Sequence, residues 1–170
     1  AVLHLLDLGH RRIAYVGCPD RPRSNARRLQ GYTEALATQG LLPPPGLVLE
    51  QSGIGDDLSR GQAGLASLLA ITDPPTAVLC YNDLTAIGAL LEARQRGLRV
   101  AADLSIVGFD DVREAALVAP SLTTVRQPRR EMGRRAAAML LAVLRGENVS
   151  DEVIAPELVI RESSAPPSVR

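Results

Sequence analysis

Pairs of acidic and amide side chains stand where apolar segments of this sequence end. Asn82 and Asp83 follow the run "AVLCY", and Asp110 and Asp111 follow "LSIVGF". One residue of each pair can cap the next helix, because carboxylate and amide oxygens accept the free N–H groups of a first helical turn. Capping does not account for the second residue. The second residue of each pair is therefore a candidate for contact with a ligand.

Arg28 is a basic residue that could join these acids. It lies beside Leu29, Tyr32 and Leu36, which follow the spacing of an apolar helix stripe. A guanidinium group suits pairs of sugar hydroxyls or a ligand carboxylate, because its N–H donors form a planar fork. The alternative is a surface arginine paired with a local carboxylate.

Motifs of common enzymes are absent from the sequence. It contains no GxGxxG after the first predicted strand, no GxxxxGK[ST], no HExxH and no GxSxG. Its only histidines, His4 and His10, have no nucleophile beside them in the sequence. A crevice of Asp, Asn and Arg without a base of suitable pKa favours polyol binding over catalysis. We therefore expect no enzyme activity, no cofactor and no metal site.

Short β-rich segments alternate with helical ones, which is typical of an α/β fold with a doubly wound parallel sheet and flanking helices. The ends of parallel strands meet at one edge, where such sheets bind ligands. Gly40 and Gly97, each followed by Leu, are expected to end two of the helices in the left-handed conformation. The predicted strands are 12–17, 47–50, 76–81, 104–109 and 122–125, and the predicted helices are 24–39, 58–70, 84–96 and the last turns of one within 1–9.

Composition limits the class of protein further. A chain of 170 residues with 46% hydrophobic content can bury one good core. Nineteen basic residues, all arginine, balance nineteen acidic ones, so the chain has no broad positive face for nucleic acid. Cys18 and Cys80 stand far apart without a CxxC motif, which favours a reducing, cytoplasmic setting. No apolar run reaches the length of a membrane span, and we expect no membrane association.

Several long strings resemble the C-terminal half of the effector-binding core of LacI/GalR-type transcriptional regulators, in order and in spacing. The resemblance covers nearly the whole chain and implies a periplasmic-binding-protein-like (type I) fold, of which this chain would be the second lobe. The strings are "LGHRRIAYVG", "RRLQGYTEAL", "PTAVLCYND", "GLRVAADLSIVGFDD", "LTTVRQP", "MGRRAAAMLL" and "ELVIRESSAPP".

The resemblance also implies roles for single residues. Arg28 matches the arginine that clamps the effector, Asp110 matches its acidic partner, and Asn82 matches a residue lining the cleft. Ser24 and Gln127 are weaker matches, and Asp83 is expected to cap the following helix instead. One feature departs from the family: "EQSGIGDD" has no aromatic residue where members usually place one against the effector ring.

The implied organisation has three parts. Residues 1–128 would form the C-terminal lobe, 129–146 a crossover helix that packs on an N-terminal lobe outside this chain, and 147–170 a return segment and tail. The implied partners are a small sugar or related polyol, a second copy in a homodimer, and operator DNA through an N-terminal headpiece outside this chain. The alternative function is one lobe of a periplasmic sugar-binding protein of a transport system, which would require an export signal upstream.

The segment 129–145 has the pattern of an amphipathic helix. Its apolar residues form one stripe, with most of its arginines on the other side. Without the N-terminal lobe this stripe would face water, and we expect a second copy of the chain to cover it. The stripe consists of Met132, Ala136, Met139, Leu140, Val143 and Leu144.

Overall fold

A parallel four-stranded sheet forms the centre of the computed structural model, which describes residues 1–43, 45–50, 52–53 and 55–168. The strand order is β2-β1-β3-β4, with every neighbouring pair parallel. This order confirms the predicted α/β fold with a doubly wound sheet. The strands are β1 (Ile13–Val16), β2 (Val48–Leu49), β3 (Ala77–Cys80) and β4 (Ser105–Val107).

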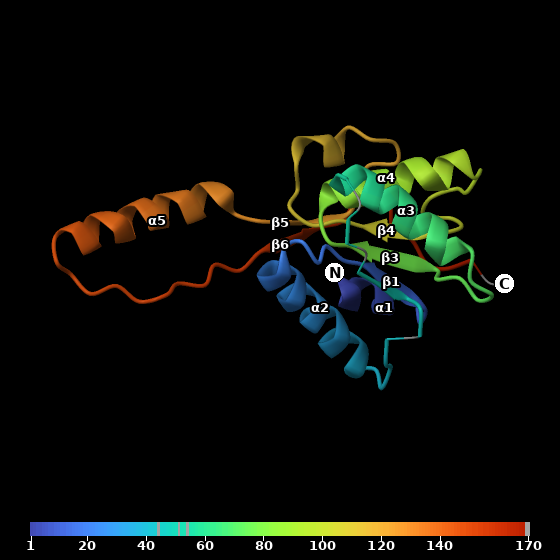
Figure 1. Cartoon of the computed structure of the whole chain (residues 1–170), viewed down its shortest axis with the longest axis horizontal. Coiled ribbons are helices and arrows are strands. Elements are labelled where there is room, and N and C mark those ends of the chain that lie inside the picture. The colour runs from blue at the N-terminus through green and yellow to red at the C-terminus, as the bar shows by residue number, and fades with distance from the viewer. Residues whose placement is uncertain (44, 51, 54, 169–170) are drawn as a thin grey trace.

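Helices cover both faces of this sheet (Figure 1). The helices α1 (Val2–Asp7) and α2 (Pro22–Ala37) pack on one face, where Tyr15, Tyr32 and Leu36 are buried together. The helices α3 (Asp57–Leu69) and α4 (Asp83–Gln95) pack on the other face over β1, β3 and β4. Strands covered on both sides explain why "AVLC" and "SIV" are apolar at nearly every position. Gly40 and Gly97 have φ of 66° and 73°, so the predicted left-handed helix ends are confirmed.

Two glycines let α3 and α4 approach each other closely. A Cβ atom added at Gly61 would lie 1.9 Å from the backbone oxygen of Thr85. A Cβ atom added at Gly88 would lie 2.0 Å from the backbone oxygen of Leu58. The two backbones are therefore in direct contact, with no room for a side chain between them.

The remaining helix projects from the body of the molecule (Figure 1). Strand β5 (Thr124–Arg126) leads into α5 (Arg129–Leu144), and the chain returns as β6 (Glu157–Val159), antiparallel to β5. No residue of α5 is buried, and Leu140 and Leu144 are 60% and 74% exposed. The predicted helix is confirmed, and Leu140, Val143 and Leu144 of its apolar stripe are exposed. The rest of the stripe, Met132, Ala136 and Met139, lines a recess together with Glu152 and Ile154 of the return segment. Among the described residues, no helix is both long and apolar enough to cross a membrane.

The predicted strand 122–125 differs from expectation. The observed strand β5 begins at Thr124 and pairs antiparallel with β6. Isolated bridges, such as the one between Val107 and Thr123, connect this part of the chain to β4 and the residues after it. A short 3-10 helix, η1 (Arg113–Ala116), lies between β4 and β5 and was not predicted.

The segment that follows β6 is bound to the body by buried polar contacts. Ser163 is fully buried, and its hydroxyl donates to the carbonyl of Ile106 in β4 and accepts from the backbone N–H of Thr123. The buried His10 donates from Nε2 to the carbonyl of Ala165 at 2.9 Å. The return segment therefore packs between the edge of the sheet and the first turn of the chain.

Candidate functional site

Arg28 projects from α2 toward the carboxyl ends of β3 and β4. Its guanidinium carbon lies 4.4 Å from the ring centre of Tyr81 and 3.9 Å from that of Phe109. Both contacts are cation–π interactions, which orient the planar guanidinium. One of its N–H groups also donates to the carbonyl of Tyr81. Arg28 is therefore held in place before any ligand binds.

Asp110, Gln127 and Ser24 gather around Arg28. A carboxylate oxygen of Asp110 lies 3.5 Å from Nη2 of Arg28 and accepts a hydrogen bond from the Gln127 side chain. The hydroxyl groups of Ser24 and Tyr81 hydrogen-bond at 2.7 Å. The Arg28 and Asp110 side chains remain 17% and 25% exposed, so the pair can be reached from solvent.

A recess of about 640 Å³ opens beside this cluster between α1, α2 and the sheet edge. Arg28, Ser24, Gln127 and Phe109 line it, together with apolar side chains of α1 and β3. Four of the residues singled out from the sequence thus converge: three line this recess, and Asp110 contacts two of them.

Asn82, the fifth candidate, engages α3 and α4. Its side-chain oxygen accepts from the backbone N–H of Thr85 at 2.9 Å, and its amide donates to Asp57 at 2.7 Å. Asn82 is therefore the N-cap of α4, and the expectation that Asp83 would cap this helix is wrong. The reason is register, because α4 begins at Asp83, one residue earlier than a cap at Asp83 would require. A role for Asn82 in contacting a ligand stays a prediction.

Asp83 connects the backbone segments that carry the site residues. It is fully buried, and its two carboxylate oxygens accept from the Thr124 hydroxyl and from the backbone N–H of Val112. Burial raises the pKa of Asp83, while these two hydrogen bonds oppose the rise. This carboxylate joins the start of α4 to β5 and to the loop after β4.

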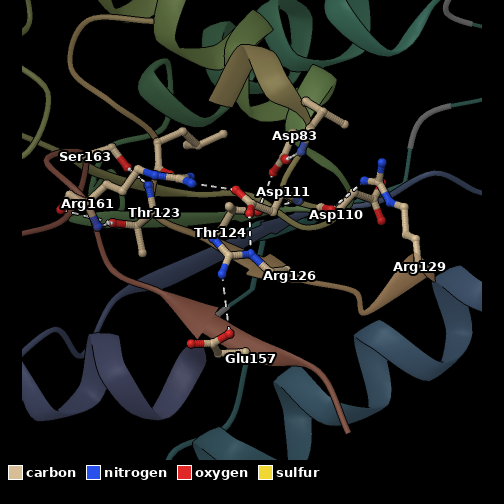
Figure 2. A network of polar contacts seen from close by, with 12 residues as sticks. Asp83, Asp110, Asp111, Thr123, Thr124, Arg126, Arg129, Glu157, Arg161 and Ser163 are labelled. Atoms are coloured by element: carbon tan, nitrogen blue, oxygen red, sulfur yellow. Dashed lines mark hydrogen bonds and ion pairs between the residues drawn. The ribbon is translucent and has the colours of Figure 1, made fainter. Parts of the chain in front are cut away.

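Asp111 belongs to a network of charges rather than to the recess (Figure 2). Each of its carboxylate oxygens accepts from one arginine at 2.6 Å, Arg126 on one side and Arg161 on the other. Arg126 continues to Glu157 of β6 at 3.5 Å. Burial alone would raise the pKa of Asp111, but the two arginines outweigh it and hold that pKa below its usual value.

Sequence reasoning missed the aromatic residues of the site. The expected aromatic position after the second strand lies in "EQSGIGDD", where Gln51 and Ile54 fall outside the described residues. Tyr81 and Phe109 instead stand at the ends of the segments containing β3 and β4, each directly before a polar pair. Their place in "LCYND" and "GFDD" was the signal that could have identified them. Arg126 and Arg161, which bind the Asp111 carboxylate, lie too far from Asp111 in the sequence for their spacing to indicate the contact.

The arrangement suits binding more than proton transfer. His4 and His10 contact Ser164 and Ala165 of the return segment, and neither lines the recess. Within the described part of the chain, no three His, Cys, Asp or Glu residues are grouped to hold a metal ion. A guanidinium, a carboxylate, a carboxamide and a hydroxyl offer the mixed donors and acceptors that hydroxyl groups need.

The chain matches a known protein family over most of its length. Residues 2–164 match the family model described as periplasmic binding protein-like domain. The HTH-type transcriptional repressor CytR of Escherichia coli is 38% identical over 96% of this chain and 48% of its own length. The chain thus spans about half the length of the curated relatives it matches.

Solved structures agree with this comparison. A LacI family transcriptional regulator from Mycobacterium smegmatis superposes with a TM-score of 0.88 at 38% identity, over 98% of this chain and 62% of that one. A complex of the transcriptional regulator CelR with cellobiose superposes with a TM-score of 0.87 at 34% identity, over 96% of this chain and 50% of that one. These matches confirm the resemblance stated from the sequence and favour a regulator over a transport protein. The chain belongs to the periplasmic-binding-protein-like domain family, in the form found in the effector-binding cores of LacI/GalR-type transcriptional regulators.

Proposed function

We propose that this chain is the effector-sensing and dimerisation portion of a DNA-binding regulator. The observation that carries the proposal is the cluster of Arg28, Asp110, Gln127 and Ser24 at the carboxyl edge of the sheet, beside the recess. Operator DNA would be bound through an N-terminal headpiece outside this chain, in the cytoplasm. The relatives compared above are named as regulators, which supports a binding function over an enzymatic one.

The proposed regulator has its sensing site between two lobes. Residues 1–128 supply one wall, 129–146 cross to the other lobe, and 147–170 return. The projection of α5 away from the body, with no residue buried, supports this division. One wall alone loses the contacts of the other, so we expect this chain to bind its effector weakly.

The effector class that we propose is a sugar or related polyol. Arg28 offers paired N–H donors, Asp110 offers acceptor oxygens, and Gln127 offers both, which together match vicinal hydroxyl groups. The complex of CelR with cellobiose shows a related regulator holding a sugar.

A first prediction tests this site with the chain as it stands. Titration with D-ribose, D-glucose and cellobiose, followed by protein NMR, is expected to shift the signals of Arg28 and Gln127 with a dissociation constant in about the millimolar range. Arg28→Ala and Asp110→Ala should each weaken binding by about 2 kcal/mol, because each removes a charged hydrogen-bond partner of the sugar and leaves the other member of the pair without it.

The matched control for these variants is Arg99→Ala, which removes an arginine paired with Asp103 at the opposite end of β4. It should leave every binding shift unchanged. A sugar that binds the Arg28→Ala variant as tightly as the parent chain would remove Arg28 from the site.

We propose self-association through α5 as the second function of this chain. Leu140, Val143 and Leu144 are 60%, 51% and 74% exposed, and each large apolar side chain left in water forfeits about 1.5–3 kcal/mol. Burial against a second copy, by helix pairing or by exchange of the segment, would recover part of this free energy. Leu84 and Leu91 of α4 are also about 40% exposed and could extend the same contact.

A second prediction follows for the association state. The double variant Met139→Glu, Leu140→Glu should shift the chain toward monomer in sedimentation velocity, because two charges would have to be buried in the contact. Leu117→Glu, on an exposed turn after η1, is the matched control and should not change the sedimentation. A parent chain that is already monomeric at high micromolar concentration would rule out this contact.

A further inference from the structure

Two consecutive residues at the end of the β4 segment adopt a backbone conformation that favours glycine. Asp110 has φ of 121° and Asp111 has φ of 50°. Residues other than glycine rarely adopt these φ values, and they keep this strained conformation only where contacts with their surroundings hold it. The turn they form directs the Asp110 carboxylate toward Arg28 and Gln127.

The Asp111 side chain makes two of the contacts that hold this turn. Its carboxylate accepts from Nε of Arg126 and from Nη2 of Arg161, both at 2.6 Å. Arg161 is itself fixed, because its other terminal nitrogen donates to the carbonyl of Leu122 at 2.8 Å. Figure 2 shows the Asp111 carboxylate between these two guanidinium groups.

Asp110, in contrast, makes no side-chain contact with Arg126 or Arg161, and its carboxylate contacts Arg28 and Gln127 of the site instead, while its backbone is held on both sides. Its N–H donates to the carbonyl of Val125 at 2.8 Å, and its own carbonyl accepts from Arg129 at the start of α5. A change in the backbone of Asp111 would therefore rotate the peptide of Asp110 and move its carboxylate away from Arg28.

We propose that Asp111, clamped by Arg126 and Arg161, is a positioning residue that aims the Asp110 carboxylate at the effector. Asp111 does not bind the effector itself, because both of its oxygens are used by arginines. The part of this inference that concerns an effector rests on the proposed function. The part that concerns the geometry of Asp110 does not.

The experiment compares side-chain NMR signals of Arg28 and Gln127 in four forms of the chain without ligand. These are the parent, Asp111→Asn, Asp110→Asn and the variant with both changes. Asparagine keeps the size of the side chain and tolerates positive φ, so Asp111→Asn removes chiefly the charge that the two arginines grip. The matched control is Asp103→Asn, which removes a carboxylate gripped by Arg99 just before β4.

We expect Asp111→Asn to move the Arg28 and Gln127 signals toward their positions in Asp110→Asn, and Asp103→Asn to leave them unmoved. In the variant with both changes, the loss of Asp111 should add nothing, because its effect passes through Asp110. A folded Asp111→Asn chain with parental Arg28 and Gln127 signals would overturn the proposal, and so would additive shifts.

Should Asp111→Asn fail to fold, Arg126→Gln decides the question. The Arg126 side chain is 47% exposed, so its loss is tolerated more easily, and it should produce a smaller shift in the same direction. Parental signals in that variant would also overturn the proposal.

Titration with cellobiose and D-ribose separates this inference from the proposed function. If either sugar binds, Asp111→Asn should raise its dissociation constant about tenfold, with no further change when Asp110 is already replaced. If neither sugar binds the parent chain, the sugar assignment fails, while the ligand-free signals still decide whether Asp111 positions Asp110.

Discussion

Alanine at Gly61 or Gly88 is expected to lower the free energy of unfolding by about 3 kcal/mol or more. The added methyl group would lie 1.9 Å from the Thr85 oxygen in the first case and 2.0 Å from the Leu58 oxygen in the second. Both obstacles are backbone atoms, so α3 and α4 would have to move apart. That movement would open the core that both helices share with β1 and β3.

Other glycines of the same chain provide matched controls. Gly31 in α2 and Gly133 in α5 have no heavy atom within 4 Å of an added Cβ atom. Alanine at either position should raise the free energy of unfolding by about 0.5–1 kcal/mol, because glycine is the weaker helix former. Urea unfolding followed by circular dichroism measures all four variants. Equal stability of the Gly61→Ala and Gly31→Ala chains would contradict the close contact of α3 and α4.

His10→Ala is expected to cost about 2–4 kcal/mol of unfolding free energy. The imidazole is 1% exposed and contacts Thr76 through Nδ1 at 2.9 Å, and Ser105 and Ala165 through Nε2 at 3.1 and 2.9 Å. Alanine would leave a cavity and remove a partner of three polar groups, of which the Ser105 hydroxyl is buried. Thermal and urea unfolding measure the loss.

The same residue should make stability depend on pH. Burial lowers the pKa of His10 in the folded chain, against the hydrogen bond to Ala165 that raises it. The unfolded chain then binds a proton more readily, so stability is lost as pH falls below the ordinary histidine pKa of about 6.5. Burial lowers the pKa of His4 as well, which acts in the same direction.

The free energy of unfolding should therefore be lower at about pH 5.5 than at about pH 7.5, and this difference should be smaller in His10→Gln than in the parent chain. His4→Gln is the variant to compare with it, because His4 also contacts the return segment, at Ser164, but is less buried than His10. A His10→Gln chain with the parental pH dependence would show that the loss comes from other groups.

The alternation of apolar strands and helices was enough to predict the sheet and its covering layers. Runs such as "AVLC" and "SIV" needed cover on both faces, and the structure provides it. The contact of Gly61 with α4 could not be predicted, because the sequence does not reveal which helices cross or where. The antiparallel pair of β5 and β6 joins segments more than thirty residues apart, a separation that local patterns do not describe.

The candidate site was predictable in part, for a similar reason. Arg28 lies in the second turn of α2 and Asp110 follows a strand, and the parallel fold brings such positions to one edge. The choice between Asn82 and Asp83 as cap depended on a shift of one residue, which is smaller than the precision of a helix boundary read from sequence. The grip of Arg126 and Arg161 on Asp111 depends on the path of the return segment.

The hydrogen bond between His10 and Ala165 also sets when this chain can finish folding in a cell. The two residues are 155 positions apart, and a ribosome adding about 5–20 residues per second needs roughly 8–30 s to make the intervening chain. Until then, His10 and Ser105 lack the Ala165 carbonyl that both of them contact, and the outer edge of β4 stays open. A nascent chain with an uncovered strand edge is a substrate for chaperones and a risk for aggregation. Closure of the fold is thus deferred until Ala165 has been made, however early the first strands emerge.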